Sequence, residues 1–297
     1  MKPLRLLVLL LVLLAATACQ QSPAPDAKPL VIASFYPMYD FARQVAGDRA
    51  QVVSLVPPGV HGHDWEPSPQ DVARLRQARV FVYNGAGFEP WAQKMITEAA
   101  RPSTVVVAAS TGLARARSDG TNEVDPHVWL DPVLAQGEVE AIRGALEHGD
   151  PAGKVVYDEN ARAFKAKLAE LHERFAAGLR DCARREVVVT HTAFGYLTRR
   201  YQLEQVAVMG LAPESEPSPA ALAHIVRVAR QRKVTTIFVE PLVNPRLGET
   251  LARELGAKVL SLNPIEGVTA QEAAAGKSYP DLMVQNLESL RAGLGCK

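Results

Sequence analysis

The chain has 297 residues, of which 47% are hydrophobic and 22% are charged, and its net charge is +1. This near-neutral balance provides no basic surface for a polyanion and argues against a nucleic-acid partner. The length exceeds one typical hydrophobic core and predicts two lobes in a chain that we expect to be monomeric.

The first 18 residues have the layout of an export signal, with positive charges before an apolar run. The small residues before Cys19 resemble a bacterial lipoprotein cleavage site, at which Cys19 becomes the lipidated first residue. An ordinary secretory peptide cleaved nearby is the alternative. Residues 19–28 are polar and rich in proline and alanine, which predicts a tether. We therefore expect an exported protein, lipid-anchored at the outer face of the cytoplasmic membrane or in the periplasm.

Two further cysteines, Cys182 and Cys296, lie in the part of the chain that is predicted to be exported. Disulfides persist outside the cytoplasm, so the two could form one bridge. Two free thiols are the alternative, because the sequence does not give the distance between them.

Short β-rich runs alternate with helix-compatible segments in the first half of the chain. The order βαβα predicts a lobe over residues 29–150 with a mostly parallel sheet. The predicted strands are residues 31–35, 51–56, 79–84 and 103–109, and the predicted helices are residues 37–46, 69–77 and 90–100.

The second half repeats this alternation and predicts a second α/β lobe over residues 183–297. Its predicted strands are residues 186–191, 204–209, 235–240 and 258–262, with helices that begin near Phe194, Ser218, Pro245 and Tyr279.

A long proline-free segment within residues 151–182 separates the two series. Its apolar residues recur at steps of three and four, which predicts one helix of ~40 Å with a single apolar face. These residues are Phe164, Leu168, Leu171 and Phe175. The fold class is therefore α/β, with two lobes joined by one long rigid helix.

Three histidines lie where parallel strands are predicted to end. His63 follows the second strand, His127 lies in the loop after the fourth, and His191 closes the fifth. Since the carboxyl ends of parallel strands face the functional crevice, we expect these three side chains to meet there. Neutral imidazoles are good Zn²⁺ ligands, so the pattern predicts a zinc site. The helical histidines His148, His172 and His224 are expected to be structural.

Four stretches of the sequence carry a family resemblance. They are PPGVHGHDWEPSPQDV, DPHVWLDP, the TH of EVVVTH followed by AFGYLTRRYQL, and PESEPSP. Together they resemble the zinc and manganese substrate-binding proteins of ABC transporters. The resemblance implies two lobes joined by a backbone helix, with the metal in the cleft between them. It assigns His63 and His127 of the first lobe and His191 of the second as ligands, and gives His61 no fixed role.

The same resemblance favours zinc, because manganese-selective members tend to carry a carboxylate where His191 stands. Residues 111–123 lack the histidine-rich loop of many zinc-specific relatives, so we expect no zinc-gathering segment there. The fourth ligand is commonly an aspartate after the last strand, where this chain has Asn263. Water is the first expectation for that position, and Glu240 is the second.

The expected function is therefore capture of Zn²⁺ and its delivery to an ABC-type membrane permease, without catalysis. A manganese or other divalent-metal binder of the same family is the nearest alternative. A zinc hydrolase would need a general base and an open pocket, which the sequence does not show. A surface adhesin would leave the three histidines unexplained.

Overall fold

A computed structural model describes residues 28–63, 65–116, 123–207, 210–211, 219–243 and 246–297. The predicted signal peptide, the lipidation site Cys19 and nearly all of the predicted tether lie outside these residues. Within the described part of the chain, no helix is long and apolar enough to cross a membrane.

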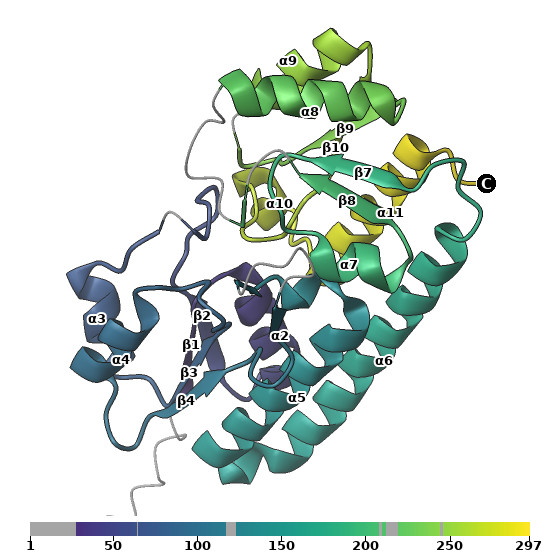
Figure 1. Cartoon of the computed structure of the whole chain (residues 1–297). Coiled ribbons are helices and arrows are strands. Elements are labelled where there is room, and N and C mark those ends of the chain that lie inside the picture. Colours follow the sequence, from purple (N-terminus) through teal and green to yellow (C-terminus); the bar gives the residue numbers. More distant parts are fainter. Residues whose placement is uncertain (1–27, 64, 117–122, 208–209, 212–218, 244–245) are drawn as a thin grey trace, which may run out of the picture.

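The first lobe contains a four-stranded parallel sheet with strand order β2-β1-β3-β4 (Figure 1). All four predicted strands are present, each shorter than its predicted range. The strands are β1 (Leu30–Ala33), β2 (Gln51–Ser54), β3 (Val80–Tyr83) and β4 (Val105–Ala108). The helices are α2 (Tyr36–Ala46), α3 (Pro69–Leu75), α4 (Ala92–Ala99) and α5 (Pro132–Gly149).

Alternation along β1 explains how this sheet is covered on both faces, because successive side chains of a strand point to opposite sides. Val31 and Ala33 belong to the main core with residues of α2 and α5. Ile32 packs in a second core with Leu75 of α3 and Met95 of α4. The sheet is therefore buried on both faces, as parallel sheets usually are.

The second lobe contains a parallel sheet with strand order β10-β9-β7-β8. Its strands are β7 (Glu186–Val189), β8 (Glu204–Ala207), β9 (Thr236–Val239) and β10 (Lys258–Ser261). Its helices are α7 (Gly195–Arg200), α8 (Pro219–Gln231), α9 (Arg246–Leu255), α10 (Ala270–Ala274) and α11 (Tyr279–Leu294). In both lobes the first strand lies between the second and the third, so the two sheets share one strand order.

Helix α6 (Lys154–Gly178) connects the lobes and packs on α2 and α5 of the first and on α11 of the second (Figure 1). Its 25 residues span ~38 Å. A short 3₁₀ turn, η2 (Pro151–Gly153), precedes it. The four predicted apolar positions are buried, together with Tyr157 and Ala161. The predicted two-lobed α/β fold with one long connecting helix is confirmed.

Direct contacts also join the lobes. The indole nitrogen of Trp129 donates to the carbonyl oxygen of Pro264 at 2.8 Å, and the Tyr279 hydroxyl donates to the carbonyl oxygen of Trp129. The guanidinium of Arg200 on α7 pairs with Asp131, which caps α5, at 2.8 Å. The residues that follow His127 therefore contact the second lobe directly.

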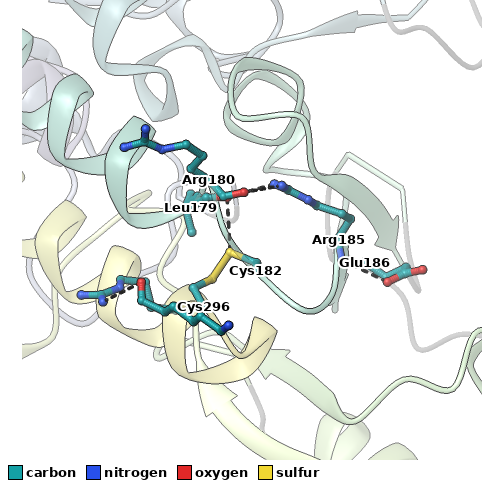
Figure 2. The surroundings of a disulfide bond; sticks show 8 residues. Leu179, Arg180, Cys182, Arg185, Glu186 and Cys296 are labelled. Atoms are coloured by element: carbon teal, nitrogen blue, oxygen red, sulfur yellow. Dashed lines mark hydrogen bonds between the residues drawn. A yellow bond between two sulfur atoms is a disulfide. The ribbon is translucent and has the colours of Figure 1, made fainter.

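A disulfide joins Cys182, just beyond α6, to Cys296, just beyond α11 (Figure 2). The Sγ atom of Cys182 also lies 3.3 Å from the carbonyl oxygen of Leu179, which accepts a hydrogen bond from Arg185 at 2.9 Å. The bridge therefore ties the C-terminus of the chain to the end of the connecting helix.

Candidate metal centre

The three predicted histidines come together with one carboxylate. His63, His127, His191 and Glu266 each offer a donor atom, and these atoms all lie within 4.8 Å of one another. His63, His191 and Glu266 follow the carboxyl ends of β2, β7 and β10. The cluster therefore forms at the strand ends, where parallel sheets place their functional loops.

A short hairpin brings the remaining histidine to the cluster. Strands β5 (Arg115–Ala116) and β6 (Val124–Asp125) pair antiparallel, and His127 follows them at the start of the 3₁₀ helix η1 (Val128–Leu130). The Tyr196 hydroxyl of α7 donates to the carbonyl oxygen of Asp125 at 2.9 Å. The second lobe thus helps to hold the loop that carries His127.

Oxygen Oε1 of Glu266 faces the Nε2 atoms of all three histidines. It is 3.0 Å from Nε2 of His127, 3.1 Å from Nε2 of His191 and 3.7 Å from Nε2 of His63. With zinc–nitrogen and zinc–oxygen bonds of about 2.0 Å, neighbouring ligand atoms of a tetrahedral zinc site lie about 3.3 Å apart. The distances from Oε1 to the nitrogens of His127 and His191 are close to this spacing, and the distance to His63 is slightly longer.

Two further carboxylates orient the histidines. Nδ1 of His127 lies 2.8 Å from Asp125, and Nδ1 of His191 lies 2.6 Å from Glu240, which also accepts a hydrogen bond from Thr190. When Nδ1–H donates to a carboxylate, Nε2 is left with its lone pair for a metal. Both rings therefore present their ligating nitrogen toward Glu266.

The structure differs from the sequence-based expectation at the fourth position. Oδ1 of Asn263 accepts a hydrogen bond from the backbone N–H of Ile265 at 2.7 Å, so the amide supports its own turn. Glu240 faces Nδ1 of His191, on the side of the ring away from the cluster. Glu266, three residues after Asn263, completes the cluster of four donor residues, which contains neither Asn263 nor Glu240.

Local backbone geometry, which the sequence does not predict, brings Glu266 to the cluster. Ile265 has a φ of 59°, an uncommon conformation for a β-branched residue, and it redirects the chain immediately before Glu266. The backbone N–H of Asn263 is held by Asn286 of α11 at 2.8 Å. The available signal was that Glu266 is the only carboxylate of the segment LNPIEG.

Burial and neighbouring charges shift the pKa values of the titratable groups in the cluster. Burial alone would lower the pKa of His191, but Glu240 and Glu266 outweigh it and raise that pKa to about 10. Burial would also lower the pKa of His127, but the hydrogen bonds of this ring to Asp125 and Glu266 raise it. Burial would raise the pKa of Glu266, yet the surrounding histidines hold it well below the usual range. In the metal-free protein, Glu266 is therefore held as a carboxylate beside His127 and His191, whose pKa values are raised.

Apolar rings enclose the first-lobe side of the centre. The Phe88 ring lies 4.4 Å from the His63 ring, and the Trp129 ring lies 5.3 Å from the His127 ring. A cleft of about 330 Å³ beside His63 is lined by residues of both lobes, including Phe88 and Leu211. Of the four donor residues, only His63 is not fully buried, and it lines this cleft.

The other histidines have separate surroundings. His148 is exposed on α5, and His172 on α6 contacts the Tyr201 hydroxyl at 3.2 Å. The side chain of His224 lies outside what the structure describes. His61, in contrast, lies beside the cluster, with Nε2 at 2.8 Å from Oε2 of Glu266.

Fold and site together define a two-lobed α/β protein with a buried three-histidine, one-carboxylate centre at the lobe junction. Residues 31–293 match the family described as ZnuA, zinc-uptake complex component A periplasmic, and the chain belongs to that family. This confirms the resemblance to zinc-type substrate-binding proteins that the sequence motifs indicated.

Individual relatives agree with this assignment. The chain is 37% identical over 279 residues to the high-affinity zinc uptake system protein ZnuA of Bacillus subtilis, covering 89% of this chain and 87% of that protein. It is 34% identical to the zinc-binding lipoprotein AdcA of Streptococcus pneumoniae, of which it spans 61%. The Zn(II)-bound ZnuA-like domain of AdcA superposes with a TM-score of 0.79 at 37% identity, covering 90% of this chain and 99% of that domain.

Proposed function

We propose that this protein captures Zn²⁺ outside the cytoplasm and delivers it to an ABC-type membrane permease. The observation that carries the proposal is the buried donor set of His63, His127, His191 and Glu266, which both lobes build. The relatives' names, which refer to zinc uptake and zinc binding, support the same cargo.

The donor set supports zinc over manganese. Three imidazoles and one carboxylate suit a borderline-soft ion that accepts four ligands, whereas manganese prefers oxygen donors and stands lower in the divalent affinity order. Glu266 also supplies the negative charge that three neutral imidazoles lack. An imidazole-rich site of this kind therefore favours zinc when both ions are present.

The geometry supports binding rather than hydrolysis. A catalytic zinc keeps one position open for water, with a general base beside it. Here Glu266 takes the fourth ligand position, and the neighbouring carboxylates Asp125 and Glu240 are hydrogen-bonded to the histidines. We therefore assign the centre a transport role without catalysis.

The anchor and the partner follow from the same proposal. Export with lipidation at Cys19 would hold the monomer at the outer face of the membrane, close to its permease. The relative named a lipoprotein supports this placement.

The test is zinc competition against a chromophoric chelator. We expect tight one-to-one binding by the wild type and a loss of about 100-fold or more in His127→Ala, which corresponds to ~2.8 kcal/mol. His148→Ala is the control, because that side chain is exposed on α5, and it should bind like the wild type. Equal affinity of the wild type and His127→Ala would refute the assignment.

A further inference from the structure

The two oxygens of Glu266 have different surroundings. Oε1 faces His127, His191 and His63, whereas Oε2 lies 2.8 Å from Nε2 of His61. His61 does not belong to the set of donors that lie within 4.8 Å of one another. It therefore contacts the carboxylate from outside the cluster.

Both atoms of this contact lack another partner. Within the described part of the chain, Nε2 of His61 and Oε2 of Glu266 are buried and have no aligned hydrogen bond. A buried polar atom without a partner is costly, and the 2.8 Å between Nε2 of His61 and Oε2 of Glu266 is a hydrogen-bonding distance. Nε2 of His61 and Oε2 of Glu266 can therefore satisfy each other by one hydrogen bond.

Two glycines bring the loops that carry these residues together. A Cβ on Gly62, between His61 and His63, would lie 2.9 Å from the carbonyl oxygen of Glu266. A Cβ on Gly267 would lie 2.6 Å from the carbonyl oxygen of Val60. Side chains at these positions would force the loops apart, so the backbone itself places His61 against Glu266.

The backbone N–H of Gly59 adds a direct link between these loops, since it donates to the carbonyl oxygen of Val268 at 2.7 Å. The His61–Glu266 contact is therefore part of a docked pair of loops, one from each lobe.

The chemical consequence concerns how many oxygens Glu266 can offer. Larger oxygen-preferring cations take six or more ligands and often bind both oxygens of one carboxylate, whereas zinc is satisfied by four donors. A donor on Oε2 draws that oxygen away from the ion and leaves Oε1 as a single ligand. One hydrogen bond can therefore limit the coordination number of the site.

We propose that His61 is a positioning residue that restrains Oε2 of Glu266 and thereby favours four-coordinate zinc over manganese. This inference rests on the proposed function. It assigns His61 no bond to the metal and makes metal selectivity depend on a residue outside the ligand set.

The experiment compares His61→Leu and His61→Gln, which have similar bulk but differ in the ability to donate to Oε2. The dissociation constants of Zn²⁺ and Mn²⁺ would be measured by chelator competition for both variants, the wild type and His148→Ala. Visible absorption of the Co²⁺-loaded proteins would report the coordination number, because four-coordinate Co²⁺ absorbs much more strongly than six-coordinate Co²⁺. His61→Ala repeats the comparison without the added bulk of leucine.

We expect His61→Leu and His61→Ala to reduce the preference for zinc over manganese by at least about tenfold, the effect typical of residues that orient ligands. Their Co²⁺ absorption should weaken. His61→Gln should keep most of the preference and the strong absorption, and His148→Ala should match the wild type.

An unchanged preference and spectrum in His61→Leu and His61→Ala would overturn the inference while leaving zinc capture intact. A loss of zinc in His61→Gln as large as that in His127→Ala would also overturn it, because His61 would then be a ligand. Failure of the wild type to bind zinc would instead refute the proposed function itself.

Discussion

At the scale of single residues, the charges of a few side chains determine the chemistry of the metal centre. Glu266 is buried with four imidazoles around its two oxygens, and Asp125 and Glu240 fix the far side of two of those rings. The pKa values of His127 and His191 are raised, so an arriving zinc ion must displace protons from these two rings. Zinc capture is therefore an exchange of protons for metal.

Zinc affinity should rise with pH well above the usual histidine range. The pKa of His191 is raised to about 10 in the metal-free protein, so its ring still holds a proton at pH 8 that zinc must displace. At pH values below that pKa, the apparent zinc affinity should fall by about tenfold for each unit of decrease in pH and for each proton that zinc must displace. Calorimetry in buffers of different ionisation enthalpy would measure the protons released. Zinc binding at pH 8 without proton release would contradict the raised pKa.

The fourth position can be tested with a pair of variants. Glu266→Gln should lower zinc affinity by at least about tenfold, ~1.4 kcal/mol, because it removes the anionic donor. Adding Asn263→Asp to that variant should not restore binding, since the side chain at position 263 is held by the N–H of Ile265. Recovery of affinity in the double variant would show that position 263 reaches the metal.

The histidines and the carboxylate differ in how far the sequence predicts them. His63 and His191 follow strands whose apolar runs are easily recognised, so the fold itself indicates where they meet. Glu266 depends on the positive φ of Ile265 and on the contact between Asn263 and Asn286. Both are tertiary features without a local pattern, so the sequence does not place Glu266 beside the histidines.

At the scale of elements, the donors of the metal centre lie on loops that follow strands and not on helices. The loop after β2 carries His61 and His63, the loop after β10 carries Glu266, and the two dock through their backbones. The geometry of the donors therefore depends on how closely these loops approach.

Gly62→Ala should weaken zinc binding without removing any ligand. Its Cβ would lie 2.9 Å from both the carbonyl oxygen of Glu266 and the Phe88 ring, so the loops must separate. We expect about 1–3 kcal/mol of destabilisation and a measurable loss of zinc affinity. Gly144→Ala is the matched control, because a Cβ there meets nothing within 4 Å. Wild-type thermal stability and affinity in Gly62→Ala would show that the close approach is unimportant.

The elements themselves were largely predictable. Helix α6 was expected from the regular spacing of Phe164, Leu168, Leu171 and Phe175, all of which are buried. The hairpin of β5 and β6 was not expected, because two-residue strands leave no alternating pattern. That hairpin orients Asp125 and His127, so part of the site rests on an element that the sequence does not reveal.

At the scale of the whole molecule, two lobes with one strand order both contribute donors to the candidate metal centre. Helix α6 connects the lobes (Figure 1), and the disulfide ties the end of α6 to the end of α11 (Figure 2). The family's zinc-loaded relative shares this overall architecture. The centre exists only where both lobes contribute, because His63 and His127 come from one and His191 and Glu266 from the other.

The disulfide should contribute strongly to stability without affecting the metal. The two cysteines are 114 residues apart, and the chain-entropy estimate for a loop of this size is about 5 kcal/mol. In protein produced from Gln20 onward, unfolded and unreduced, thiol counting should find no free cysteine. The double variant Cys182→Ala, Cys296→Ala should unfold at lower denaturant concentration but bind zinc normally. Two titratable thiols in the wild type would exclude the bridge.

The central claim is that one zinc ion binds between the lobes on His63, His127, His191 and Glu266. Anomalous diffraction at the zinc absorption edge, from crystals of the zinc-loaded protein, tests it most directly. We predict a single strong peak about 2.0 Å from Nε2 of each histidine and from Oε1 of Glu266. A peak elsewhere, or one completed by Asn263, Glu240 or water in place of Glu266, would contradict the account.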